Sequence, residues 1–171
     1  MDIPIQRMQQ YVYDSLLALW GITNTKYKSY PRCYRGRIND SYVAMNYESK
    51  GEYKPAFWDD SFSVVSFFGV GEKITAGTIN VVDVHLVFFV NIKKVKPSIP
   101  HYGDEEIRLD VTSVIGRGLF SMSYVNMELG LKNVLKEYPG SILDKGLTLV
   151  DTYPVHCFRL NFTLKYQNNI C

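Results

Sequence analysis

The spacing of apolar residues predicts that the chain begins with a helix. Over residues 5–20 an apolar side chain recurs every three or four positions, at Ile5, Met8, Val12, Leu16 and Leu19. A repeat of this length gathers apolar side chains on one face of an α-helix. Gly21 follows, at a position where glycine commonly ends a helix. We therefore predict an amphipathic helix over residues 5–20 whose apolar face packs on a core.

Two later stretches alternate apolar with polar or mixed positions. In residues 78–95 the apolar face consists of Val82, Val84, Leu86, Phe88, Val90 and Ile92. In residues 156–166 it consists of Phe158, Leu160, Phe162, Leu164 and Tyr166. Period two is the repeat of a β-strand. We predict two long strands, centred on Leu86 and Leu160, that lie together in a single sheet.

Two further helices are predicted in the second half of the chain. Residues 104–116 begin with three carboxylates, Asp104-Glu105-Glu106, which stabilise the positive end of a helix dipole. Residues 125–138 have Val125, Leu129 and either Val134 or Leu135 on one predicted helix face, and Pro139-Gly140 follows them. Both stretches therefore have the spacing and the end signals of helices.

Weaker patterns complete the set of elements. They predict strands at residues 41–48 and 63–70, and a short strand at 146–150 that forms a hairpin with 156–166. Glycine, proline and charged residues predict exposed loops at about 49–61 and 96–103.

The order of the elements predicts the fold class. Helix, strands, helices and strands follow one another in blocks and do not alternate, which favours an α+β fold. We expect an antiparallel β-sheet with the N-terminal helix and two further helices packed on one face. A chain of 171 residues is the size of one ordinary domain, so residues 1–171 are interpreted as a single domain.

Charge and cysteine usage narrow the function classes. The chain has 19 basic and 17 acidic side chains, a net charge of +2, so any contact with nucleic acid must be local. Three cysteines without a CxxC spacing predict neither a disulfide framework nor a zinc site, and fit a reducing compartment. No apolar run has the length of a signal peptide or a membrane span, so we expect neither export by that route nor membrane insertion.

The sequence contains no catalytic constellation that we can identify. The three histidines are far apart, and neither HExxH nor HxH occurs. Residues 69–73, GVGEK, resemble a phosphate loop only superficially, because Ile74 stands where such a loop has Ser or Thr. We therefore predict no enzyme activity, no cofactor and no metal. A deep polar cavity with converging titratable groups would contradict this prediction.

Residues 26–37 form the one local signal with functional content. They hold five basic residues, three tyrosines and no carboxylate, and Pro31 and Gly36 suggest a loop or an edge strand. Basic groups with stacking tyrosines are the combination that single-strand nucleic-acid binders use. A solvated edge strand, or a basic strip that matches an acidic patch on a neighbouring subunit, would show the same pattern of residues. The candidate contact residues here are Lys26, Lys28, Tyr30, Arg32, Tyr34, Arg35 and Arg37.

The predicted loop at 49–61 supplies three further contact candidates. Tyr53, Phe57 and Trp58 are large aromatic residues in a segment otherwise rich in charge, glycine and proline. Aromatic side chains exposed on a loop are typical of a surface that binds a partner. The chain as a whole holds 13 tyrosines, which can equally pave a β-rich surface.

The layout resembles the head-to-tail connector and tail-completion proteins of bacteriophages, which include the tail terminators. The resemblance rests on the opening helix 6–20, the long strand 81–95, the helix pair 104–116 and 125–138, and the alternating ending 153–166, YPVHCFRLNFTLKY. It implies a structural virion protein, made in the host cytoplasm, that forms a homo-oligomeric ring in the neck or tail. Its partners would be copies of itself, neighbouring neck or tail rings, and DNA that passes through the channel without sequence-specific binding.

The sequence departs from a minimal tail terminator at residues 26–37 and 49–61, so a specialised connector ring is an equal expectation. Two other hypotheses remain open. The first is a small single-stranded nucleic-acid-binding module that uses Lys26 to Arg37. The second is an enzyme with a site of an unfamiliar type.

Overall fold

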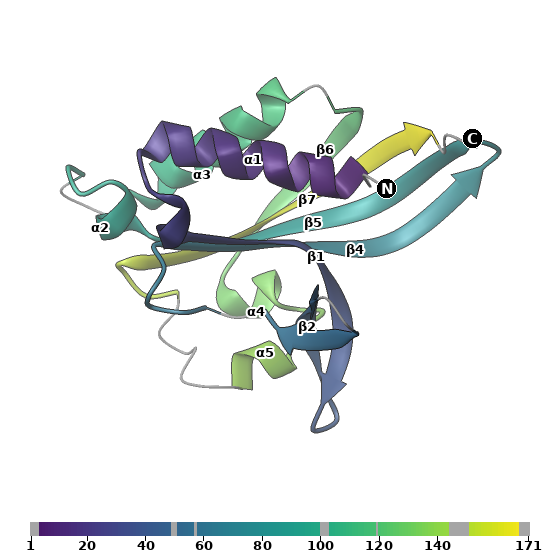
Figure 1. Ribbon diagram of the computed structural model, residues 1–171, viewed down its shortest axis with the longest axis horizontal. Coiled ribbons are helices and arrows are strands. Elements are labelled where there is room, and N and C mark those ends of the chain that lie inside the picture. The colour runs from purple at the N-terminus through teal and green to yellow at the C-terminus, as the bar shows by residue number, and fades with distance from the viewer. Residues whose placement is uncertain are drawn as a thin grey trace.

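A seven-stranded sheet organises the molecule in the computed structural model, which describes residues 4–48, 51–56, 58–99, 103–118, 120–143 and 151–167 (Figure 1). The order across the sheet is β3-β2-β1-β4-β5-β7-β6. The strands are β1 Tyr27–Ile38, β2 Ser41–Glu48, β3 Glu52–Pro55, β4 Val64–Ala76, β5 Ile79–Asn91, β6 Met122–Leu129 and β7 Val155–Gln167. All neighbours pair antiparallel except β1 and β4, which are parallel.

The two predicted long strands are adjacent in this sheet, as expected. β5 and β7 pair along the full length of both strands, and Leu86 lies directly opposite Leu160. Both side chains are fully buried, and the rings of Phe88 and Phe158 stack with their centroids 5.2 Å apart. The alternating pattern therefore reports the buried centre of the sheet.

Helices cover both faces of the sheet, unequally. α1 Pro4–Trp20 and α3 Asp104–Arg117 lie together on one face, here called the helix face, and share its large core (Figure 1). The indole Nε1 of Trp20 donates to the carboxylate of Asp110 at 2.8 Å and ties the two helices together. These two helices match the predictions at 5–20 and 104–116, and the α+β fold class is confirmed.

The opposite face carries a smaller core. There Val134, Leu135 and Tyr138 pack on Phe67 and other apolar side chains of β4 and β5. The short helices α4 Leu131–Val134 and α5 Gly140–Leu143 lie on this side (Figure 1). Two further single turns are η1 Asn24–Lys26, which lies between α1 and β1, and α2 Ile92–Val95, which lies between β5 and α3. Among the described residues no helix combines the length and apolar character needed to cross a membrane.

The predicted helix at 125–138 is wrong. Residues 122–129 form β6, which pairs with β7, and only Leu131–Val134 is helical. Gly130 separates the two with a φ of +82°, a conformation that glycine adopts without steric cost. The free side of β7 offered backbone partners to this segment, and that pairing overrode its helical spacing. The second further helix expected on the helix face is therefore a strand, with short turns on the opposite face.

Two other boundaries differ from the predictions. The strand predicted at 78–95 ends at Asn91, because the Asn91 side chain accepts a hydrogen bond from the Lys94 amide at 3.2 Å and starts α2. The strand predicted at 63–70 continues to Ala76 and forms a long hairpin with β5. The predicted strand at 146–150 lies outside the described residues.

The basic run at residues 26–37 had been expected to form a loop or an edge strand, and this expectation is wrong. The run forms β1, an inner strand between β2 and β4. Pro31 is tolerated because the register shifts between Tyr30 and Cys33, so the ladder is interrupted where proline lacks an N–H. Within 49–61 a short strand, β3, forms the outermost strand at this end of the sheet, so this segment is not wholly a loop.

If β5 and β7 form the centre of the core, Leu160→Ala will lower the free energy of unfolding by about 2–5 kcal/mol, the usual cost of truncating a fully buried leucine. Leu109→Ala is the matched control, because Leu109 is 62% exposed on α3. That control is expected to change stability by about 0.5 kcal/mol or less. Urea denaturation measures both, and equal costs would contradict the assignment.

Candidate functional site

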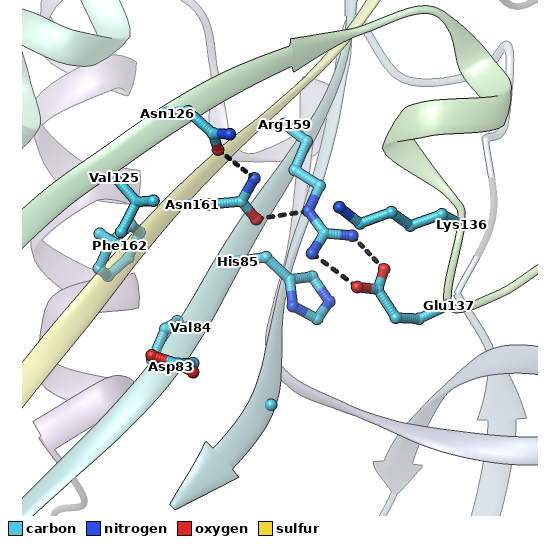
Figure 2. A pocket seen from close by; sticks show the side chains of 11 residues that line it. Asp83, Val84, His85, Val125, Asn126, Lys136, Glu137, Arg159, Asn161 and Phe162 are labelled. Carbon is cyan, nitrogen blue, oxygen red and sulfur yellow. Dashed lines mark hydrogen bonds and ion pairs between the residues drawn. The ribbon is translucent and has the colours of Figure 1, made fainter.

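A polar cavity with converging titratable groups lies within the part of the chain that the structure describes. It has a volume of about 360 Å³ and lies on the opposite face, where β5, β7 and β6 meet the segment after α4 (Figure 2). β5 contributes Asp83 and His85, β7 contributes Arg159 and Asn161, and Glu137 follows α4. The cavity therefore tests the prediction that the chain has no catalytic site.

Arg159 is the centre of this cavity and is almost completely buried. Its two terminal nitrogens donate to both carboxylate oxygens of Glu137, one of them at 2.8 Å. Its Nε donates to the Asn161 side-chain oxygen at 2.7 Å and lies 3.3 Å from a carboxylate oxygen of Glu128. Figure 2 shows the guanidinium held between Glu137 and Asn161. Its positive charge is thus matched by two carboxylates.

The carboxylates of the cavity are matched in turn. The Glu128 carboxylate accepts a hydrogen bond from the ammonium group of Lys136 at 2.7 Å and another from the side-chain amide of Asn161 at 2.9 Å. Burial alone would raise the pKa of Glu128 and of Glu137. Hydrogen bonds from Lys136 and Asn161 to Glu128, and from Arg159 to Glu137, instead hold both pKa values below the usual range. Both groups are therefore ionised and engaged at neutral pH.

His85 is buried beside this network. Its Nε2 lies 2.9 Å from the Tyr138 hydroxyl, and burial, together with the positive charge of Arg159, lowers the pKa of His85 to about 4. Space for the pair depends on Gly69, because a Cβ there would lie 1.9 Å from the imidazole Nε2. At neutral pH the imidazole is therefore uncharged, with the Nε2 atom occupied.

This arrangement favours a structural network over a catalytic site. A general acid or base for work near neutral pH needs a pKa near that pH and a free path to a substrate proton. His85 has neither, and the two glutamates are neutralised by Arg159 and Lys136. Among the described residues no group of three or more His, Cys, Asp or Glu side chains is placed to hold a metal ion.

Sequence reasoning missed this network, although its strand residues lie on the mixed faces of the two long strands. His85 and Arg159 are 74 positions apart in the sequence, and Glu137 lies in a segment that had been interpreted as helix. The available signal was the position of Arg159 and Asn161 in the middle of a strand that is otherwise buried. A buried arginine requires a carboxylate partner, but the sequence does not say which one.

The basic run is divided between the two faces of the sheet. Lys28 and Tyr30 lie on the opposite face, as do Arg35 and Arg37 beyond the register shift, whereas Arg32 and Tyr34 lie on the helix face. Lys26 lies outside the strand, in η1. Of the three tyrosines, Tyr27 is buried and Tyr30 is half-buried. The run therefore does not form one continuous groove of cations and stacking rings.

Individual arginines nevertheless stack on tyrosine rings. The Arg35 guanidinium lies 3.7 Å from the ring centroid of Tyr42, and that of Arg32 lies 4.8 Å from the ring centroid of Tyr34. The Nε of Arg35 also donates to the Glu137 carbonyl at 3.1 Å. Arg35 is therefore partly occupied within the fold, while Arg32 extends an aromatic surface.

Three tyrosines gather on the helix face at the β3 end of the sheet. Tyr53 makes edge contacts with Tyr34 and with Tyr47, at centroid distances of 5.7 Å and 5.2 Å. The exposed fractions are 39% for Tyr34, 50% for Tyr47 and 51% for Tyr53. We call Tyr34, Tyr47 and Tyr53 the tyrosine face. It includes two of the predicted contact residues and one, Tyr47, that the sequence had not singled out.

The other aromatic candidates of this segment have different outcomes. The Trp58 ring is half-buried and packs 6.4 Å from the ring of Phe89, while its Nε1 donates to Asp60 at 2.8 Å. The expectation that Trp58 projects freely from a loop is therefore wrong, because the small core on the opposite face provides an apolar site for its ring. Phe57 lies outside the described residues.

A second exposed apolar surface lies at the other end of the sheet. A groove of about 290 Å³ runs between α3 and β6 and is lined by Thr112, Ile115, Gly116, Met122, Tyr124, Leu160 and Phe162. Tyr124 is 58% exposed and Leu109, on α3, is 62% exposed. We call this surface the edge groove. The sequence did not predict it, because β6 had been interpreted as helix.

Comparison of the chain with protein-family models gives no match, and comparison with curated proteins gives no match of significance.

A change in pH tests the state assigned to His85. Its pKa is about 4 in the folded chain and near 6.5 when unfolded, so the unfolded state binds more protons between these values. Stability is expected to be fully present above pH 6.5 and to fall, by on the order of 3 kcal/mol, as the pH drops to 4. Chemical denaturation across this range measures the loss. His85→Gln should remove this part of the loss, while the parts due to His156, Glu128 and Glu137, whose pKa values are also lowered, remain. A profile identical to that of the parent would contradict the assignment.

A double mutant tests whether the Arg159 network is structural. Arg159→Met leaves the Glu137 carboxylate half-buried without its cation and is expected to cost about 3 kcal/mol of stability. Adding Glu137→Met removes the orphaned charge, so the double variant should be more stable than the single one. Thermal or urea unfolding checks the order. A double variant less stable than Arg159→Met would show that the ion pair itself is not the reason for the cost.

Proposed function

We propose that this protein is a structural subunit of a homo-oligomeric ring in a bacteriophage neck or tail, joining adjacent rings around the DNA channel. The observation that carries the proposal is the pair of unpaired sheet edges, β3 and β6, with exposed apolar side chains at both. Among the described residues no strand pairs with the outer side of either one. Natural proteins protect exposed edges of this kind unless a partner covers them.

The distribution of exposed apolar side chains supports the same proposal. The tyrosine face and the edge groove lie at opposite ends of the sheet, so one copy of the chain offers two different surfaces. Contacts between unlike surfaces repeat around an axis, and they generate a closed ring when the rotation between neighbouring copies closes. The polar cavity does not compete with this function, because the charges of Arg159, Glu137 and Lys136 are matched within the chain.

A projecting arm offers the material for contacts between rings. β4 and β5 extend beyond the helices on the helix face (Figure 1) and join in a turn at Gly77, where φ is +63°. Ile74 and Ile79 near this turn are 60% and 44% exposed. We propose that this arm reaches the neighbouring ring of the neck or tail.

The nucleic-acid alternative has weaker support. Stacking of successive bases needs several exposed rings along one cationic path. Within residues 26–37 the strand places Arg32 and Tyr34 on one face and Arg35 and Arg37 on the other, and it buries Tyr27. The alternative therefore rests on the composition of the run more than on its geometry.

Native mass measurement distinguishes the two functions. The ring hypothesis predicts a large fixed multiple of the 19.7 kDa subunit, with a central opening in electron micrographs. The alternative predicts a monomer whose affinity for oligonucleotides falls steeply with salt, because each phosphate contact releases counterions. A monomer with strong, salt-sensitive oligonucleotide binding would contradict the ring proposal.

A further inference from the structure

The topology fixes the relative direction of the two sheet edges. In a seven-stranded sheet with only antiparallel neighbours, the first and last strands would run in the same direction. Here the single parallel pair, β1 with β4, removes one reversal. β3 and β6 therefore run in opposite directions. When two copies with the same orientation meet edge to edge, β6 of one and β3 of the next are antiparallel, the pairing that short strands form most readily.

The exposed side chains at the two edges lie on the same face of the sheet. Tyr124 pairs in register with Phe162, which belongs to the core of the helix face, and it lines the edge groove. At the other end Tyr53 pairs with Tyr47 of β2. Ala44 of β2 faces the small core on the opposite face, and Tyr47 lies three positions further along the strand, so Tyr47 and Tyr53 lie on the helix face. A sheet continued from copy to copy therefore places the tyrosine face of one molecule beside the edge groove of the next.

One carboxylate beside the edge groove complements the cations at the other end. Of the four carboxylates of α3, Asp104 pairs with Arg108, and Glu106 and Asp110 pair with Lys96, so Glu105 is the one without an ion pair among the described residues. Glu105 shares a helical stripe with the exposed Leu109 and with Thr112, which lines the groove. β1, which supports the tyrosine face, has four cationic side chains and no carboxylate, and Arg32 lies on the helix face beside Tyr34.

We propose that β6 of one copy pairs antiparallel with β3 of a second copy, with the tyrosine face of the second copy packed against the edge groove of the first. This contact rests on the proposed ring function and names the surfaces through which the ring closes. The contact is heterologous, so every copy uses both surfaces and neither is left free in a closed ring. Tyr53 and Tyr124 lie at its centre.

Single lysine substitutions test the contact from both sides. Tyr124→Lys changes the β6 side and Tyr53→Lys the β3 side, and lysine on an edge strand opposes edge pairing. Leu19→Lys is the matched control, because Leu19 is 52% exposed but lies on α1, away from both edge strands. Each edge variant should weaken self-association by about 30-fold, the loss typical of a central interface tyrosine. The control should assemble as the parent does.

A mixing experiment tests the heterologous geometry. The two edge variants are each expected to be monomeric, but each keeps one intact surface. Mixed in equal amounts, they should form a dimer of one Tyr124→Lys chain and one Tyr53→Lys chain, and no larger species. Native mass spectrometry resolves this product, and circular dichroism of each variant verifies that it is folded. If the mixture stays monomeric, the intact β3 side of one variant does not bind the intact β6 side of the other, and the proposed contact is overturned.

The outcomes separate this inference from the ring proposal itself. If the parent chain and both edge variants all form the same multiple of the subunit mass, the ring stands and the β3 to β6 contact is wrong. If the parent is monomeric, thiol cross-linking decides. Tyr53→Cys with Tyr124→Cys, in a Cys171→Ser background, should give a ladder with a short bis-maleimide at millimolar protein, since Cys33 and Cys157 are buried. If the parent does not assemble and the double cysteine variant gives no ladder, both proposals are overturned.

Discussion

The pairing of β5 with β7 is the constraint on which the rest of the structure depends. These two strands are hydrogen-bonded to each other along their whole lengths, and their apolar sides form the floor on which α1 and α3 pack. Because side chains alternate between faces, a slip of β7 by one residue along β5 would move Leu160 and the other apolar side chains of β7 out of the core. The same register aligns His85 with Asn161 and places Arg159 beside it. One pairing thus determines both the core and the polar cavity.

The periodic parts of this arrangement were predictable from the sequence, and the parts that depend on strand neighbours were not. α1, α3 and the two central strands have repeats long enough to define one face. β6 has equally good helical spacing at Val125 and Leu129, and only the vacant side of β7 makes it a strand. For β1, Pro31 suggested an edge, because the sequence gives no sign that the ladder shifts register at that position.

The candidate site divides in the same way. Tyr53 was predicted as a contact residue because an aromatic side chain in a polar segment is conspicuous, and its exposure agrees with that prediction. Its grouping with Tyr34 and Tyr47 depends on the pairing of three strands, which no local pattern encodes. The Arg159 cavity depends on an even longer separation. Its partner Glu137 is positioned by the turn that follows α4. The sequence therefore predicts that Arg159 has a carboxylate partner, but not that this partner is Glu137.

The buried charges also help to fix the register of β6 on β7, in a sheet whose two edge strands are unpaired among the described residues. An ion pair in the interior gains little stability, because desolvation offsets most of the Coulombic attraction. It does penalise alternatives, since a shift of β6 along β7 would separate Glu128 from Arg159 and leave a buried cation short of one carboxylate. Apolar contacts on the helix face tolerate a shift of two residues better, because β7 carries an apolar side chain there at every second position. The Arg159 network therefore fixes the position of β6, the strand whose free edge the proposed assembly requires, and the cost of burying these charges is consistent with that role.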